Sequence, residues 1–291
     1  GLQVSLRTDV FQMAVFLVVF SIAFIYMIFS SDFSFNSILQ STGVHDQSAR
    51  PGYVLIYVAL LQVFSYPAHD PVMMDRGFIA NQNKTNYSFI LAFLLSTFCI
   101  FGFGMFGIQA GLIGYAYENQ LLGTWQNMFG PGVYFLLICS LLVSAMSTLD
   151  SALASSARLV IDEFYIFKRS IKNGRIAMST FMAFGLLFTL FPSQSLFDAV
   201  AVTGTASMFL TPVMIVTFLG GNIPIWAYTI TWFFSMIGAF AYIFRDIETI
   251  TYLLPGLHKY DQLLSICLYI IVFGFLICFI GALSNRFLAK T

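Results

Sequence analysis

Residues 135–156 read FLLICSLLVSAMSTLDSALASS. The first nine residues are apolar apart from Ser140, as in a helix that lies among lipid tails. The remainder carries hydroxyl groups and a carboxylate, and a polar group left unsatisfied in hydrocarbon costs several kcal/mol. The stretch therefore predicts a membrane helix whose later turns face something other than lipid.

The composition of the whole chain agrees with a membrane location. Hydrophobic residues make up 59% of the chain and charged residues 9%, whereas a soluble domain carries about 25% charged residues. Because the formal net charge is zero, nothing favours nucleic acid as a partner. We therefore predict an all-α integral membrane protein, since the alternating pattern of a β-barrel is absent from the sequence.

Eight segments are candidate membrane spans, because a helical span needs about 20 apolar residues. They cover about 11–30, 53–66, 88–115, 132–157, 176–191, 198–219, 225–244 and 263–284. The second is short and is followed closely by Pro67 and Pro71. The four cysteines lie in apolar runs without the spacing of a metal site, so we expect core or lipid-facing thiols.

The basic residues predict the orientation of these spans. Ten of the 13 Lys and Arg side chains fall on the side of the two termini, and Arg50, Arg245 and Lys259 fall on the other. Basic residues concentrate on the cytoplasmic side of membrane proteins. We therefore expect a multi-pass protein of the plasma or inner membrane with both termini in the cytoplasm. The glycosylation sequons at Asn83 and Asn86 would then remain unmodified.

The hydroxyl groups of the opening stretch fall on one helix face. Ser144, Ser147, Thr148 and Ser151 have the spacing i, i+3, i+4 and i+7, and Asp150 lies at the edge of that face. Such hard oxygens suit Na⁺ better than any soft metal. A carboxylate at membrane depth costs roughly 2.5–3.5 kcal/mol on insertion scales and usually marks an ion or substrate path.

Structural roles for these residues stay open. Small hydroxyl residues also let helices pack closely and form hydrogen bonds between them, and Asp150 in a protonated state needs only a hydrogen-bond partner. The segment RTDVFQ at 7–12 places Asp9 and Gln12 at the start of the first span. A carboxylate there is also favoured by the helix dipole, and we interpret Asp198, which opens the sixth span, in the same way.

Residues 66–76, YPAHDPVMMDR, predict a broken helix. Two prolines four residues apart remove backbone donors and should unwind the helix near residues 66–70. Non-helical backbone at membrane depth lines cavities, and discontinuous helices hold the substrate in many transporters. The alternatives are that the span simply ends here and that His69 is a loop residue. Catalytic motifs are absent from the sequence, so we do not expect an enzyme.

These segments together resemble the sodium–solute symporter family. Residues 144–165, SAMSTLDSALASSARLVIDEFY, resemble its signature; RTDVFQ resembles the start of core helix five; and YPAHDPVMMDR resembles broken core helix six. The resemblance implies the second half of a LeuT-type inverted-repeat transporter in a single transmembrane domain over 1–291. Core helix five would cover about 8–30, the second repeat about 51–220, and two further helices about 224–285.

The resemblance also implies ligand roles. A main Na⁺ site would use Ser144, Ser147 and Thr148, and a second cation site would use Asp9, Asp150 and Ser151. Asp150 replaces a hydroxyl residue of the family pattern, which leaves open a stronger cation site, a bound proton, or a proton in place of Na⁺. Tyr66 approximately matches an aromatic gate and Asp70 a substrate-contacting amide. With His69, they form the predicted substrate pocket.

The function implied is Na⁺-coupled uptake of a small organic solute from across the bilayer. Core helix one and its neighbours, which the family uses to complete the ion and solute sites, are missing from the sequence, and we expect a fragment because the chain begins with Gly1. Two alternatives stay open. One is a membrane sensor with a symporter-like core, and the other is a remnant that no longer transports.

Overall fold

The computed structural model of the protein describes residues 2–41, 49–66, 70, 72–73, 77, 80–114, 121–189, 196–256 and 258–288. Every regular element within these ranges is a helix, as predicted. Six helical segments are long and apolar enough to cross a membrane. They are Thr8–Ile28, Gln82–Leu112, Leu121–Glu163, Phe197–Phe218, Ile225–Ile243 and Lys259–Asn285. The chain is therefore an all-α protein with the architecture of a multi-pass membrane protein.

The two remaining predicted spans, at 53–66 and 176–191, are helical but fall short of a crossing. Helix α3 (Arg50–Val63) has only 14 residues, whereas a span needs about 20. Helix α8 (Ile171–Thr189) has 19 residues, but Lys172 and Arg175 in its first two turns leave too short an apolar stretch. The predicted count of eight spans is thus reduced to six within the described ranges.

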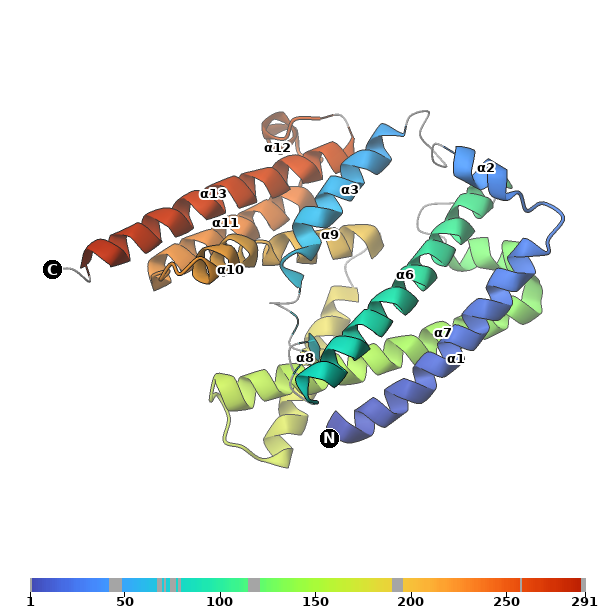
Figure 1. The fold of residues 1–291 in the computed structure, drawn as a ribbon, viewed down its shortest axis with the longest axis horizontal. Helices are drawn as coiled ribbons and strands as arrows, with labels where there is room; N and C mark the ends of the chain where they lie inside the picture. Colours follow the sequence, from blue (N-terminus) through green and yellow to red (C-terminus); the bar gives the residue numbers. More distant parts are fainter. Residues whose placement is uncertain are drawn as a thin grey trace. The chain divides into compact units, whose positions relative to one another are not determined.

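The helices gather into two compact units, each with its own apolar core (Figure 1). Unit 1 comprises Gly1–His45 and Pro71–Ser193, and unit 2 comprises Asp46–Asp70 and Gln194–Thr291. The chain therefore enters unit 2 briefly, returns to unit 1, and enters unit 2 again for its last third. Each unit is described below by itself.

In unit 1, the long helices α1 and α7 lie side by side and antiparallel (Figure 1). The Tyr26 ring near the end of α1 contacts Phe129 near the start of α7, at 6.2 Å between ring centroids. The opposite ends meet where Asp9 contacts Ser147. The helices of this unit are α1 (Leu2–Ile28), α2 (Phe35–Gln40), α6 (Gln82–Leu112), α7 (Leu121–Arg158), the short π-helix η1 (Leu159–Glu163) and α8.

Aromatic rings fill the core of unit 1. The Phe20 side chain is 1% exposed, and its ring centroid lies 5.0 Å from that of Phe103 and 5.8 Å from that of Phe106. Phe106 in turn meets Phe129 edge to face at 5.1 Å. Such pairs contribute about 0.5–1.5 kcal/mol each beyond the burial of their area. This cluster fixes α1 against α6 and α7, and so holds the first helix in place.

Helix α7 is interrupted near its start. Gly130 has φ 66° and ψ 172°, which a residue with a side chain rarely adopts, and Pro131 follows it. Because proline lacks the backbone N–H, the hydrogen-bond ladder is broken at this point. The regular helix that follows agrees with the predicted span at 132–157.

Unit 2 is built around α11 and α13, which pack against each other and against α3, α9 and α10. The predicted span at 198–219 is confirmed as one apolar segment, Phe197–Phe218. A tighter turn at Met208 and Phe209 divides it into two helices, α9 and α10. Pro212 explains this break, since its ring clashes with the carbonyl four residues earlier. The helices of this unit are α3, α9 (Leu196–Ser207), α10 (Leu210–Phe218), α11 (Ile225–Ile243), α12 (Glu248–Leu253) and α13 (Lys259–Leu288).

Asp198 lies in the first turn of α9, as predicted from the sequence. Its carboxylate also accepts a hydrogen bond from the Tyr242 hydroxyl at 2.9 Å and pairs with Arg245 at 3.4 Å. The Arg245 guanidinium lies over the Tyr242 ring, 4.5 Å from its centroid. These contacts join the start of α9 to the end of α11 and give Asp198 a structural role beyond the helix dipole.

The α3 helix is joined to its neighbours by a polar contact inside the unit. The Gln62 amide donates to the Ala201 carbonyl at 3.2 Å and to the Thr205 hydroxyl at 2.9 Å, both on α9. The Ser235 hydroxyl of α11 donates to the Thr205 carbonyl at 2.6 Å. Side-chain hydrogen bonds of this kind hold membrane helices together, because alternative partners are scarce in hydrocarbon.

Candidate cation site between α1 and α7

Asp9 and Ser147, two of the residues predicted to bind a cation, are in direct contact in unit 1. The Ser147 hydroxyl donates a hydrogen bond to the Asp9 carboxylate, with 2.5 Å between Oγ and Oδ1. Both side chains are partly buried. The two residues are 138 positions apart, and the antiparallel packing of α1 on α7 brings them together. The distance lies at the short end of the range for hydrogen bonds between two oxygen atoms.

The remaining hydroxyl groups on α7 differ in exposure. Ser151 is 3% exposed and Ser155 4% exposed, so the face that contains Ser147 continues into the interior of the unit. Ser144 is partly buried, and its carbonyl accepts the Thr148 hydroxyl at 3.2 Å. This bond within one helix occupies the Thr148 proton and leaves the lone pairs of its oxygen available.

Asp150 lies away from this buried face. Its side chain is exposed, and it makes no hydrogen bond or ion pair within the described ranges. The spacing argument placed it at the edge of the hydroxyl face, and its exposure agrees with that position. Its role as a cation ligand stays a prediction.

Gln12 is a candidate ligand that the predicted site did not include. Its side-chain oxygen Oε1 is buried and has no hydrogen-bond partner among the described residues. Gln12 is three residues after Asp9 and therefore shares a face of α1 with it. A buried carbonyl oxygen without a donor is uncommon and calls for an explanation such as a bound ion or water. The sequence signal was present in the segment RTDVFQ.

The two groups at this contact are hard oxygens, the Asp9 carboxylate and the Ser147 hydroxyl. Helical spacing adds two candidate oxygens, the Ser151 hydroxyl one turn along α7 and the Gln12 amide oxygen one turn along α1. Oxygen ligands of this kind suit alkali and alkaline-earth cations, and soft metals prefer sulfur or imidazole. Because a single carboxylate faces these groups, a monovalent cation balances the local charge better than a divalent one.

The predicted substrate-pocket residues belong to unit 2. Helix α3 ends at Val63, and the Asp70 backbone N–H donates to the Tyr66 carbonyl at 3.2 Å. The pKa of the Tyr66 hydroxyl is raised, mainly because the group is partly buried and to a lesser extent because the Asp70 carboxylate lies nearby. Tyr66 and Asp70 are therefore neighbours, as a shared pocket requires. His69, Pro67 and Pro71 lie outside the described residues.

No protein-family model, curated protein or solved structure matches this chain. The functional interpretation consequently depends on the sequence motifs and on the geometry described above. Among the residues that the structure describes, three or more His, Cys, Asp or Glu side chains nowhere gather into a metal-binding group.

Proposed function

We propose that the protein is a sodium-coupled secondary active symporter that imports a small organic solute. The observation that supports this proposal is the hydrogen bond between Asp9 and Ser147. The two residues come from two separate motifs, RTDVFQ and SAMSTLD, and the resemblance assigns them to neighbouring cation sites, Ser147 to the main Na⁺ site and Asp9 to the second site. Their contact therefore brings together one candidate ligand from each of the two predicted sites.

The chemistry of the contact supports cation binding. In the arrangement described, the Ser147 hydroxyl donates its proton to Asp9, but a hydroxyl oxygen also has two acceptor lone pairs. A rotation about the Ser147 side chain turns these lone pairs toward a cation, which then takes the place of the proton beside the carboxylate. The unpartnered oxygen of Gln12 provides a further neutral ligand one helical turn away.

Coupling to transport follows from the proposed LeuT-type fold. In this scheme the main site contains Ser144, Ser147 and Thr148, and the second site contains Asp9, Asp150 and Ser151. Na⁺ binds one state of the transporter more tightly and shifts the population toward it. Solute binds near Tyr66, His69 and Asp70, and one helical bundle moves against the other to change the accessible side.

A test of the cation site does not require the solute to be known. Purified protein is equilibrated with ²²Na⁺, and the variants Asp9→Asn and Ser147→Ala are compared with the native chain. Loss of a charged hydrogen-bonding group corresponds to about a tenfold to hundredfold weaker affinity. The matched control is Ser140→Ala on the same helix, because its hydroxyl is buried but donates only to the Leu137 carbonyl at 2.9 Å.

If Ser140→Ala binds Na⁺ like the native protein and the two site variants do not, the proposed site is supported. If the native chain and all three variants bind Na⁺ with the same affinity, the assignment of Asp9 and Ser147 is overturned. Proteins that bind Na⁺ but take up none of a solute library in proteoliposomes would favour the sensor alternative. A chain that inserts into membranes without binding Na⁺ would favour the remnant.

A further inference from the structure

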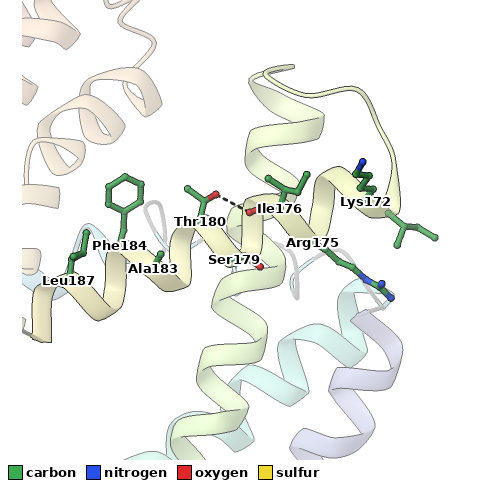
Figure 2. Close-up of a pocket in the computed structure, with 9 residues that line it drawn as sticks. Lys172, Arg175, Ile176, Ser179, Thr180, Ala183, Phe184 and Leu187 are labelled. Atoms are coloured by element: carbon green, nitrogen blue, oxygen red, sulfur yellow. Dashed lines mark hydrogen bonds between the residues drawn. The ribbon is translucent and has the colours of Figure 1, made fainter.

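One face of α8 changes from basic to apolar along the helix (Figure 2). Lys172, Ile176, Thr180 and Phe184 follow one another at intervals of four residues and form one row (Figure 2). A hollow of about 850 Å³ lies against this face, and all the described residues that line it belong to α8. The face is therefore an open surface with a charged end and a hydrocarbon end.

The charge at the basic end of α8 is not neutralised by any residue that the structure describes. Lys172 and Arg175 are exposed, and within the described part of the chain neither makes an ion pair or a side-chain hydrogen bond. The other basic residues nearby are used differently. Arg158 and Arg169 both pair with Asp162, at 4.0 Å and 3.5 Å. Figure 2 shows the Lys172 and Arg175 side chains leaving the first turns of α8 in different directions, and neither has an anionic partner among the described residues.

The apolar end has the character of a surface that contacts lipid tails. Ile176 is 43% exposed, Phe184 56% and Leu187 53%. The one hydroxyl in the row, on Thr180, donates to the Ile176 carbonyl of its own helix at 2.9 Å and so needs no external partner. The other hydroxyl that lines the hollow is on Ser179, and the remaining lining side chains beyond it, Ala183, Phe184 and Leu187, are apolar.

We propose that this face of α8 binds an anionic phospholipid. The phosphate lies between Lys172 and Arg175, and one acyl chain follows Ile176, Phe184 and Leu187 toward the bilayer centre. Basic residues next to a membrane attract anionic lipid headgroups, and the attraction is short-ranged. A lipid fits this face better than a packed protein helix, because a helix would bury both cations without an anion, which is costly.

The order of charge and apolarity along α8 matches the order within a phospholipid. The helix also falls short of a full crossing because its first turns are basic. A lipid headgroup at those turns would let the remaining apolar turns sit in hydrocarbon without burying unpaired cations. The proposal does not depend on the cation site or on transport.

The test compares two double variants in purified protein reconstituted in lipid nanodiscs. Lys172→Gln/Arg175→Gln removes the charges of the proposed site, and Lys168→Gln/Arg169→Gln removes two neighbouring charges outside the lining. Occupancy by phosphatidylglycerol and by phosphatidylcholine is measured by native mass spectrometry. For the native chain we expect phosphatidylglycerol to be preferred by about tenfold to thirtyfold, from two juxtamembrane cations.

That preference should disappear in Lys172→Gln/Arg175→Gln and persist in Lys168→Gln/Arg169→Gln. The charge-preserving variant Lys172→Arg/Arg175→Lys should keep it, which separates loss of charge from misfolding. Phe184→Ser/Leu187→Ser should weaken retention of phosphatidylglycerol, and glycerol 3-phosphate without an acyl chain should compete poorly. Equal retention of both lipids, equal losses in the two charge-removing variants, or full competition by glycerol 3-phosphate would each overturn the proposal.

Discussion

Gly102 on α6 lies directly against the ring of Phe20 on α1. A β-carbon added at this position would overlap with the Phe20 ring. The ring cannot move away cheaply, because Phe20 is 1% exposed and is surrounded by Phe98, Phe103 and Phe106. The contact between α1 and α6 therefore depends on the absence of one methyl group.

We predict that Gly102→Ala lowers the free energy of unfolding by about 1–3 kcal/mol, the usual cost of overpacking a core. Gly104→Ala is the matched control, since a β-carbon there meets nothing within 4 Å. Alanine in place of glycine inside a helix should instead stabilise by about 0.5–1 kcal/mol. Unfolding of both variants in mixed detergent micelles measures the difference. Equal stability of the two variants would contradict the described packing of α1 on α6.

At the residue scale, helical spacing predicted which hydroxyl groups of α7 share the face of the candidate cation site. The periodicity of α7 indicated that Ser144, Ser147 and Ser151 share a face, and the buried positions of that face agree with it. Spacing alone could not indicate that Asp9 faces Ser147, because that contact depends on the register of α1 on α7. The register is set by the aromatic core, whose rings carry no pairing signal in the sequence.

At the scale of helices, one amide connects α3 to the rest of unit 2. Gln62 donates to two acceptors on α9, and Thr205, one of the two, is fully buried. We predict that Gln62→Leu, which keeps the volume but removes the donor, weakens the unit by about 0.6–1.7 kcal/mol, the range measured for such bonds in membranes. Detergent unfolding followed by tryptophan fluorescence measures the effect.

The control for this experiment is Thr203→Val on α9. Its hydroxyl is exposed and bonds only to carbonyls of its own helix, Ala199 at 3.2 Å and Val200 at 3.0 Å. We expect little change there. If Gln62→Leu is as stable as the control, α3 is held by its apolar contacts and by the ion pair between Arg50 and Asp261 at 3.3 Å.

Helix boundaries were predictable where proline or glycine sets them. Pro131 with Gly130 ends one segment of α7, and Pro212 explains the break between α9 and α10, which together form the single predicted span at 198–219. The number of spans was overestimated for a different reason. The apolar runs of α3 and α8 resemble membrane spans when hydropathy is averaged along the sequence. However, α3 is short, and the first turns of α8 are basic.

At the scale of the whole molecule, the long helices fix which segments share a side of the membrane. Between Lys84 and Lys172 the chain passes through two apolar helices, α6 and α7, each long enough to cross. We predict that Lys84→Cys and Lys172→Cys react with an impermeant maleimide from the same side. The excess of basic residues predicts that this side is the cytoplasmic one.

Leu121→Cys, at the start of α7 and 48% exposed, should react from the opposite side. Labelling of intact cells and of inverted vesicles, in a background with the four native cysteines replaced, gives the answer. Reaction of Lys84→Cys and Lys172→Cys from different sides would mean that α6 or α7 does not cross. The predicted absence of glycans at Asn83 and Asn86 tests the same topology.

The division of the chain into two units was not visible in the sequence. Hydrophobic pattern locates helices, but it does not say which helices pack together, because every span presents apolar residues on most of its surface. The placement of α3 in unit 2 rests on contacts with segments far along the chain, such as that between Gln62 and Ala201. Only the three-dimensional structure reveals such pairings.

This interleaved order has a consequence for biosynthesis. The acceptor of the Gln62 amide on α9 is 139 residues further along the chain. At a synthesis rate of about 5–20 residues per second, roughly 7–28 seconds separate the two during translation. During that interval α3 has already left the ribosome, and its polar Gln62 side chain still lacks its partner on α9. The helices α6, α7 and α8 of unit 1 are being made in the meantime. The insertion machinery, or an assisting chaperone, must shelter α3 until the last third of the protein arrives.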